Sequence, residues 1–247
     1  MTHNFHYFIF KGDLMKHLSD LQAMSGFLAC LMHDINHPGV NNQYLIAIKH
    51  PKAIRYNDQS VLEFHHLAMA FKILLDPQND IFELLSEAQY WNVRQIIIKM
   101  ILSTDLSQHY NTMMTFKGRL STTKKNFPED TSEDKQLIMN ICLYAADHSH
   151  PCKPTIQYFR WMSLQMEEFY QQGDIEKKMG FQVTPFYDRT TCNPFIYQKG
   201  YLDVVVEPIY QTLVLFIQDI KDDCLIKGLE ENKKMLEQKI DETKNYE

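Results

Sequence analysis

Histidine and acidic side chains gather in four short groups along the 247 residues. The first group is His33, Asp34 and His37, which fall within five consecutive positions. Imidazole and carboxylate ligands together suit zinc, iron and manganese, whereas sites made of oxygen alone suit magnesium. An isolated His-Asp pair occurs easily by accident, so its interpretation depends on the other groups.

Three later groups repeat the same residue types. Glu63 and His66 are three positions apart, so they share one face of a helix. Thr104 and Asp105, together with His109, follow an apolar segment, and a run from Asp147 to Pro151 follows another. Unpaired charges at the ends of buried helices are costly, and bound metal ions would compensate them. A purely structural network of ion pairs is the alternative interpretation.

The segments that must position these groups have helical periodicity. No segment sustains strict alternation, and the chain has only 8 Gly and 9 Pro, so we predict an all-α fold. We expect one domain over residues 1–220, followed by a charged helical tail over residues 221–247. The six segments expected to be helical are 19–32, 61–75, 91–102, 134–146, 156–170 and 204–220.

Composition restricts the possible partners and location. The net charge of −6 and the pI of about 6.0 disfavour nucleic-acid binding. The chain contains no apolar stretch long enough to span a bilayer and no signal-peptide pattern at its start. Five Cys without a C-x-x-C pair indicate reduced thiols. We therefore expect a cytoplasmic protein without a membrane span.

The tail over residues 221–247 is rich in Lys and Glu and carries an apolar stripe. The stripe consists of Ile226, Leu229, Leu236 and Ile240, and Lys233 interrupts it. One interpretation is a solvated terminal helix that packs on the domain. The other is a short coiled-coil contact with a protein partner.

Beyond residue types, the order of the motifs resembles a known family. The run His33-Asp34-Ile35-Asn36-His37-Pro38-Gly39-Val40-Asn41-Asn42 is similar to the signature of class I 3′,5′-cyclic-nucleotide phosphodiesterases. The similarity covers residues 5–220, and the run 103–105 together with His150 leans toward the calmodulin-stimulated class. The further matching segments are 57–66, 102–105, 145–151, 167–169, 172–174, 185–189 and 198–201.

The resemblance implies a compact multi-helix catalytic domain of the HD type that holds two divalent metals, zinc and either magnesium or manganese. By matching position, His33, Asp34 and Asp147 would be metal ligands, with Asp34 bridging both ions. The residues that would hold waters on the second metal or support them are His37, Glu63, His66, Thr104 and Asp105.

The implied reaction is hydrolysis of cAMP, cGMP or both to nucleoside 5′-monophosphates by a hydroxide that bridges the metals. Gln198 would hydrogen-bond the purine edge, and Tyr201 would stack on the base. His150 and Gln165 match other substrate-binding positions. A carboxamide can turn to serve adenine or guanine, so the base preference stays open.

Two departures from the family pattern affect these expectations. The family's H-N-x-x-H motif, which supplies one metal ligand and the general acid, would fall before Met1 in an alignment without gaps. His3 and His6 are three positions apart instead of four. Gln165 occupies a position that is usually apolar. We therefore expect a catalytic domain truncated at its N-terminal side.

Two alternative functions follow from these departures. The chain could be a catalytically impaired scaffold or an interaction subunit of a larger assembly. It could also be another HD-type metal hydrolase that acts on a different phosphate ester, although the segment 198–201 argues for purine recognition.

Overall fold

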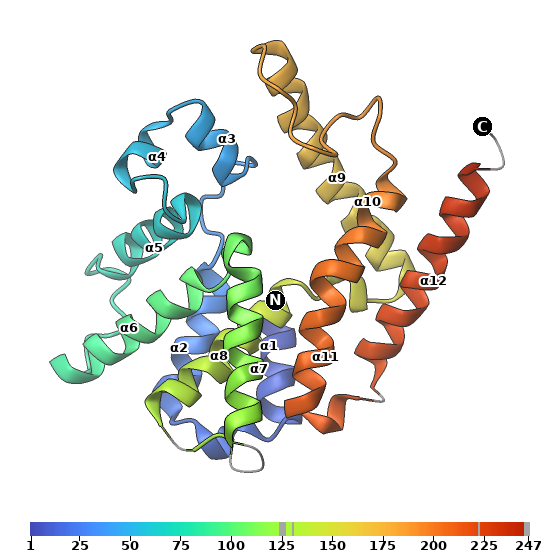
Figure 1. Ribbon diagram of the computed structural model, residues 1–247. Helices are drawn as coiled ribbons and strands as arrows, with labels where there is room; N and C mark the ends of the chain where they lie inside the picture. The colour runs from blue at the N-terminus through green and yellow to red at the C-terminus, as the bar shows by residue number, and fades with distance from the viewer. Residues whose placement is uncertain (124–126, 130, 222, 245–247) are drawn as a thin grey trace. The chain divides into compact units, whose positions relative to one another are not determined.

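The computed structural model describes residues 1–123, 127–129, 131–221 and 223–244, and every regular element in these ranges is a helix (Figure 1). The predicted all-α fold is therefore confirmed. None of the described helices is both long enough and apolar enough to cross a membrane.

The chain divides into two compact units. Unit 1 comprises Met1–Asp147 and Leu215–Ile217, and unit 2 comprises His148–Val214 and Gln218–Glu247. The predicted division into a domain over residues 1–220 and a tail stays a prediction, since compact units need not be separate domains.

Unit 1 consists of eight α-helices and two short 3-10 helices within the described residues. Helix α2 packs against α6, while α1 packs against α2 and α8. The elements are α1 (Thr2–Lys11), η1 (Leu14–His17), α2 (Asp20–Met32), α3 (Asn42–Ala47), α4 (Pro51–Arg55), α5 (Val61–Leu74), α6 (Glu87–Leu102), η2 (Leu106–Gln108), α7 (His109–Thr123) and α8 (Ser132–Asp147).

The starts of α2 and α6 follow from local hydrogen bonding. Ser19 accepts a hydrogen bond from the backbone N–H of Gln22, and the Gln22 side chain accepts one from the Ser19 N–H. Ser86 and Gln89 form the same reciprocal pair before α6. These capping boxes satisfy N–H groups that a helix start leaves open, so α6 begins four residues earlier than its apolar pattern predicted.

The loops of unit 1 that lead into the histidine-rich segments contain left-handed residues. Asn36 has φ of 60°, and Asn57 and Asp58 have φ of 52° and 60°. Asn and Asp tolerate this region better than other residues with a Cβ atom. The N-D-Q-S sequence thus forms the tight turn that starts α5 one residue after Ser60.

Unit 2 contains the remaining helices. Helix α12 packs against α10, α9 and η4. The elements are η4 (His150–Cys152), α9 (Thr155–Lys178), α10 (Pro194–Tyr201), the π-helix η5 (Leu202–Val206), α11 (Glu207–Phe216, whose last two residues group with unit 1), η6 (Gln218–Ile220) and α12 (Cys224–Lys244).

The predicted helix over residues 204–220 is wrong in its details. Helix α10 continues through the π-helical segment η5 directly into α11, and Pro208 lies in the first turn of α11. Proline has no N–H to donate to the preceding turn. A π-helical turn just before it absorbs this missing bond and keeps the helix continuous.

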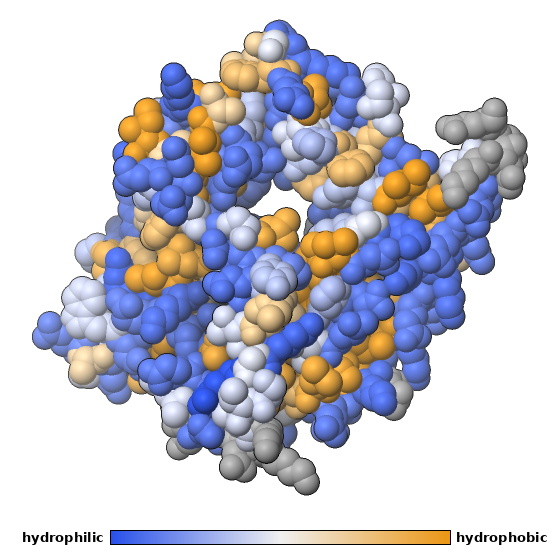
Figure 2. Space-filling model, viewed as in Figure 1, coloured by the Kyte–Doolittle hydropathy of each residue, from blue (hydrophilic) through white to orange (hydrophobic). Residues whose placement is uncertain are grey.

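Helix α12 uses its apolar stripe within unit 2. Leu236 is fully buried, and Leu225, Leu229 and Ile240 are each less than 9% exposed. Ile226 is only half-buried, so the stripe begins at Leu225 instead. Lys233, which interrupts the stripe, pairs with Asp203 and Glu207. Figure 2 shows mainly hydrophilic residues along the outer side of this helix. The stripe is therefore not available to a partner helix.

Candidate active site

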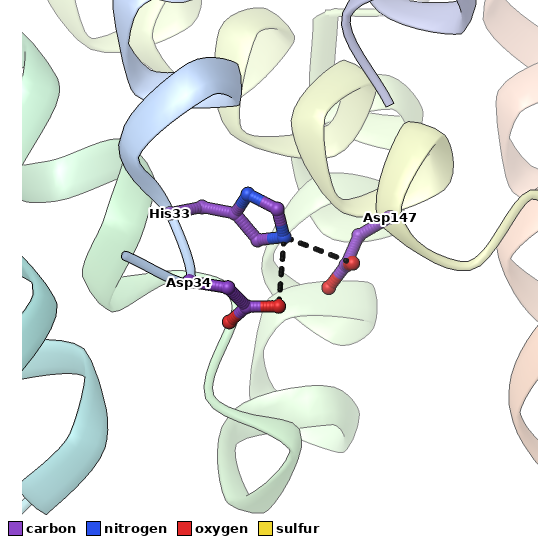
Figure 3. Close-up of side chains that lie close together, drawn as sticks. All are labelled: His33, Asp34 and Asp147. Carbon is purple, nitrogen blue, oxygen red and sulfur yellow. Dashed lines mark ion pairs between the residues drawn. The ribbon is translucent and has the colours of Figure 1, made fainter. Parts of the chain in front are cut away.

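The three predicted metal ligands lie together in unit 1. Figure 3 shows His33, Asp34 and Asp147 pointing toward one another. Each offers one potential ligand atom, and these atoms all lie within 4.8 Å of one another. His33 is the C-cap of α2, and Asp147 is the last residue of α8. The ends of two helices thus bring together residues that are far apart in the sequence.

The tautomer of His33 is set by its backbone contact. Its Nδ1 lies 3.0 Å from the carbonyl oxygen of Cys30, which can only accept, so Nδ1 carries the hydrogen. The Nε2 atom lies 3.0 Å from Asp34 Oδ2 and 3.5 Å from Asp147 Oδ1. A neutral ring would present a lone pair to two carboxylate oxygens. This geometry needs a cation, which can be a proton or a metal ion.

The charges around His33 agree with this interpretation. Burial disfavours the charged ring, but hydrogen bonds and charges from Asp147 and Asp34 outweigh burial and raise the pKa of His33 to about 10. Partial desolvation of Asp34 is likewise outweighed by His33, which holds the pKa of that carboxyl below its usual range. One nitrogen and two carboxylate oxygens match the donors of zinc and manganese sites, so these residues fit a metal ion that would replace the proton.

His66 on α5 provides a second sign that something belongs beside Asp34. Its Nδ1 lies 2.8 Å from the carbonyl oxygen of Ile35, so Nδ1 is the donor. Burial lowers the pKa of His66 to about 4, which keeps the ring neutral at pH 7. Its Nε2 lone pair then faces Asp34 Oδ1 at 3.7 Å. Two acceptors that face one another fit a water molecule whose hydrogens are shared between them.

His37 lies against His66, with ring centroids 5.6 Å apart and planes 25° from parallel. Its Nδ1 accepts a hydrogen bond of 3.1 Å from the backbone N–H of Gly39. The hydrogen of the neutral ring is therefore on Nε2, which is a donor. The predicted role of His37 in holding a water on the second metal stays a prediction.

Glu63 lies in the first turn of α5 and is tied to the start of α3. Asn42 donates from Nδ2 to Glu63 Oε2 at 3.0 Å, and its Oδ1 accepts from the backbone N–H of Leu62. Burial raises the pKa of Glu63. Glu63 is therefore a stronger base than an ordinary surface carboxylate.

Thr104 and Asp105 follow α6 and make mainly structural hydrogen bonds. The Thr104 hydroxyl donates to the carbonyl oxygen of Ile101 at 2.7 Å. Asp105 is 6% exposed and accepts from the Ser60 hydroxyl at 2.7 Å and from the Ser107 N–H at 2.9 Å. Asp105 thereby fastens the turn before α5. The predicted support of metal-bound waters by these two residues stays a prediction.

His3 and His6 both lie on the exposed face of α1. His6 stacks on Phe10 with ring centroids 4.3 Å apart. Within the described residues, neither histidine belongs to the group of potential ligands around His33. Neither histidine therefore adds a fourth donor to this group of potential ligands.

The predicted purine-binding residues lie in unit 2. Gln198 on α10 is fully buried. Its Nε2 donates to Gln165 Oε1 at 2.7 Å, and its Oε1 accepts from the Tyr158 hydroxyl at 3.2 Å. Tyr158 was missed at the sequence level, although it lies seven positions before Gln165 on the same helical face. The carboxamide of Gln198 thus has a protein partner at each end.

Tyr201 and His150 contact one another beside this glutamine pair. The His150 ring lies 5.9 Å from that of Tyr201 and 6.0 Å from that of Tyr158, and both pairs are stacked. The Tyr201 hydroxyl is hydrogen-bonded to His148 Nδ1 at 2.8 Å. His148 belongs to the predicted group 147–151, but no role was predicted for it. Stacking of Tyr201 on a base, and substrate contact by His150, stay predictions.

Comparison with known proteins places this site in a family context. The family model described as 3′5′-cyclic nucleotide phosphodiesterase matches residues 1–225. A rat protein named 3′,5′-cyclic-AMP phosphodiesterase 4C is 34% identical over 226 residues, which are 90% of this chain. A Caenorhabditis elegans protein named probable 3′,5′-cyclic-AMP phosphodiesterase pde-4 is 35% identical over 247 residues, which are 98% of this chain.

The chain spans 42% and 36% of the length of these two relatives. Among solved structures, that of LmjPDEB1 in complex with IBMX matches with a TM-score of 0.90 at 28% identity. The match covers 97% of this chain and 72% of that one. The predicted leaning toward the calmodulin-stimulated class stays a prediction.

Proposed function

The chain belongs to the 3′,5′-cyclic-nucleotide phosphodiesterase family, and on that premise we propose that it hydrolyses 3′,5′-cyclic nucleotides to nucleoside 5′-monophosphates. The observation that carries the proposal is the His33 Nε2 atom facing two carboxylate oxygens, because this geometry fits a divalent cation. The names of the two relatives make cAMP the first substrate to test, with cGMP as the second.

The proposed cofactors are two divalent metals, zinc and either magnesium or manganese. His33, Asp34 and Asp147 would hold the first, and Asp34 would also contact the second. Asp34 suits this because its side chain is 60% exposed and both of its oxygens face histidines. Bound divalent cations would neutralise charge on the phosphoryl oxygens and lower the pKa of an attacking water.

In the proposed reaction, water attacks the cyclic phosphorus, the bond to the 3′ oxygen breaks, and that oxygen takes a proton. His66 Nε2 would accept a hydrogen bond from the water and orient it, since a ring whose pKa is about 4 holds a proton poorly. Glu63 would be the better proton acceptor, because burial raises its pKa. His37 would donate to a water from Nε2, and Asp105 would keep the turn before α5 in place. None of the described residues is assigned as the acid that protonates the 3′ oxygen.

The residues proposed to bind the purine lie in unit 2, in and beside the hydrogen-bonded group of Gln165, Gln198 and Tyr158. Gln198 would read the base edge, while Tyr201 and His150 would contact the ring. Because Gln198 is fully buried and hydrogen-bonded at both ends, a base can reach it only after neighbouring side chains move. This obstacle favours the alternative proposal, a catalytically impaired scaffold or interaction subunit.

Location and protein partners are proposals as well. We propose a cytoplasmic protein, which is supported by five cysteines that are all free. A partner bound through α12 would have to use its charged outer side, since the apolar stripe is buried.

The test is turnover of cAMP and cGMP by the chain with added Mn²⁺ or Mg²⁺, with the product identified by phosphorus NMR. We expect 5′-AMP or 5′-GMP from the wild-type chain and none from Asp147→Asn. A wild-type chain that binds metal but turns over neither nucleotide would favour the scaffold alternative. Turnover of other phosphate esters with no cyclic-nucleotide activity would favour a different HD-type hydrolase.

A further inference from the structure

We propose that Asn232 on α12 is a positioning residue of the nucleotide site, because it holds the η4 turn that carries His150. This inference rests on the proposed function, in which His150 and Tyr201 contact the purine. Asn232 is fully buried. Its Nδ2 donates to the carbonyl oxygen of Pro151 and to that of Lys153, both at 2.7 Å. The two N–H groups of one side chain thus bind two backbone carbonyls of the same short turn.

The backbone of α12 also lies directly against η4. A Cβ atom at Gly228 would stand 2.5 Å from the carbonyl oxygen of Cys152 and 3.1 Å from its carbonyl carbon, so a larger residue would require a shift. Gly228 lies four positions before Asn232 and therefore on the same face of α12. The carbonyl groups of residues 151, 152 and 153 all meet this face. Contacts with three consecutive residues fix both the position and the rotation of the turn.

The η4 turn in its turn places the His150 ring. His150 is the first residue of η4, and Pro151 follows it directly. Proline restricts its own backbone and that of the residue before it, so His150 moves together with the turn. The His150 ring stacks on the rings of Tyr201 and Tyr158, with centroids 5.9 and 6.0 Å apart. These stacks therefore depend on the two hydrogen bonds of Asn232.

The next residue of α12 holds the segment that carries Tyr201. Lys233 pairs with Asp203 at 2.8 Å and with Glu207 at 2.7 Å. Asp203 lies on η5, two positions after Tyr201. Adjacent residues of one helix thus hold both η4 and η5, and α12 sets the place of His150 relative to Tyr201. The contact through Lys233 is the weaker one, because its side chains are 29–35% exposed and such ion pairs contribute little.

The test is Asn232→Leu, which is similar in shape but removes both donors. The carbonyl oxygens of Pro151 and Lys153 then lose their partner, and η4 should move toward other donors, since a buried acceptor left unpaired is costly. Stacking of a base on an aromatic ring contributes about 5- to 150-fold to affinity. We expect KM for cAMP to rise by about tenfold, while kcat changes by less than about threefold because the proposed metal ligands lie in unit 1.

This split between KM and kcat distinguishes positioning from a merely structural role. A variant that is only partly folded has fewer working molecules, so its kcat falls in proportion while its KM stays the same. The matched control is Thr212→Val, since Thr212 is fully buried and donates to the carbonyl oxygen of Pro208 within α11 at 2.7 Å. This variant loses a buried hydrogen bond of unit 2 but leaves the contacts between α12 and η4 unchanged. Its KM should stay within about twofold of wild type.

Two milder variants serve where Asn232→Leu does not fold. Asn232→Ser retains one donor and should raise KM by about threefold. Lys233→Met removes the contact with η5 and should also raise KM by about threefold. Lys239→Met is the control for the lost charge, because Lys239 lies on the same helix and pairs with Glu242 of that helix at 2.8 Å. Its KM should equal that of the wild type.

The proposal is overturned if Asn232→Leu has the KM of the wild type, or if Thr212→Val raises KM as much as Asn232→Leu does. Where Asn232→Leu does not fold, a KM that stays at the wild-type value in both Asn232→Ser and Lys233→Met overturns it equally.

Binding separates this inference from the proposed function. Equilibrium dialysis with cAMP and with cGMP gives Kd without any turnover, and partial unfolding lowers the number of bound nucleotides but not Kd. If the wild type binds either nucleotide but hydrolyses neither, the proposed function fails while the Kd of Asn232→Leu relative to wild type still decides the role of Asn232. If the wild type neither binds nor hydrolyses either nucleotide, both proposals are overturned.

Discussion

In unit 1, His33 Nε2 faces two carboxylate oxygens, whereas in unit 2 the Gln198 carboxamide has a protein hydrogen-bond partner at each end. The first cluster combines one imidazole with two acids, so a neutral ring leaves it with two negative charges. The second cluster has two amides and a phenol, and it carries no charge.

This difference separates two ways of placing polar groups inside a protein. The His33 cluster is incomplete until a cation enters, and its stability therefore depends on solution conditions. The Gln198 cluster is complete by itself, so a ligand must compete with existing hydrogen bonds. Metal, pH and amide substitutions should accordingly act on different clusters.

The largest expected effect comes from removing one acid of the first cluster. Asp147→Asn keeps the shape of the side chain but removes its charge and one anionic ligand. Substitution of a residue that merely supports a metal ligand lowers metal affinity by about 10- to 100-fold. We expect Asp147→Asn to exceed 100-fold, measured by competition of bound zinc against a chromophoric chelator.

The control is Asp219→Asn, since Asp219 is exposed on η6 and lies outside the ligand group. Its zinc affinity should equal that of the wild type. Equal affinity of Asp147→Asn and the wild type would rule out the His33 cluster as the metal site.

The second expected effect is thermal stabilisation by metal. A ligand present at 100 times its Kd and bound only to the folded state adds about 2.7 kcal/mol. For a chain of this size, that corresponds to a rise in Tm of about 5–10 °C. We expect this shift in calorimetry with zinc for the wild type but not for Asp147→Asn. Gln165→Met should show the full shift, because the second cluster binds no metal. A missing shift in Gln165→Met would contradict the separation of the two clusters.

Helix existence was predictable, because apolar periodicity and caps are local. The pattern at residues 19–32 led to α2, which starts after the Ser19 capping box. The end of α9 was not predictable in this way. It continues to Lys178, eight residues beyond the predicted end, because its buried face there is polar. Gln172 and Glu176 are almost fully buried and hydrogen-bond one another, so the apolar stripe stops before the helix does.

The candidate site also has one part that the sequence predicted and one part that it could not predict. Residue types and family resemblance predicted that His33, Asp34 and Asp147 belong together, and the structure brings them together. The contact between Gln165 and Gln198 could not be predicted, because it joins two helices and depends on which way each amide faces. The sequence indicated only that Gln165 is polar where an apolar residue is usual.

The third expected effect is a loss of stability at Asp134, a carboxylate that already has a cationic partner in Arg119. Asp134 is fully buried and accepts from Arg119 at 2.7 and 3.2 Å. The Arg119 guanidinium holds the pKa of Asp134 below its usual value of about 3.9. Asp134→Asn should cost about 2 kcal/mol at pH 7. Zinc should stabilise this variant as much as it stabilises the wild type.

The pH dependence has a defined sign. A lowered folded pKa means that the stabilisation by Asp134 is complete above the ordinary carboxyl pKa and is lost as the pH falls through the lowered value. The difference between wild type and Asp134→Asn in urea midpoint should therefore be constant from pH 7 to pH 5 and should shrink below about pH 4. A difference that stays the same at pH 3 would refute the role of the charge.

The smallest expected effect tests whether the second cluster is complete by itself. Tyr158→Phe leaves the buried Gln198 Oε1 without its donor, which should cost about 1 kcal/mol in the free energy of unfolding. Gln198→Leu alone should cost a similar amount, since it leaves the Tyr158 hydroxyl unpaired. Removing both partners is less costly than the sum, so the double variant should show a coupling energy of about 1 kcal/mol. Tyr110→Phe, at a side chain that is 75% exposed, controls for loss of a hydroxyl and should have almost no effect. If the costs of Tyr158→Phe and Gln198→Leu simply add in the double variant, the hydrogen bond between the two side chains contributes nothing to stability. The Gln198 cluster would then not be complete by itself, and the contrast with the His33 cluster would fail.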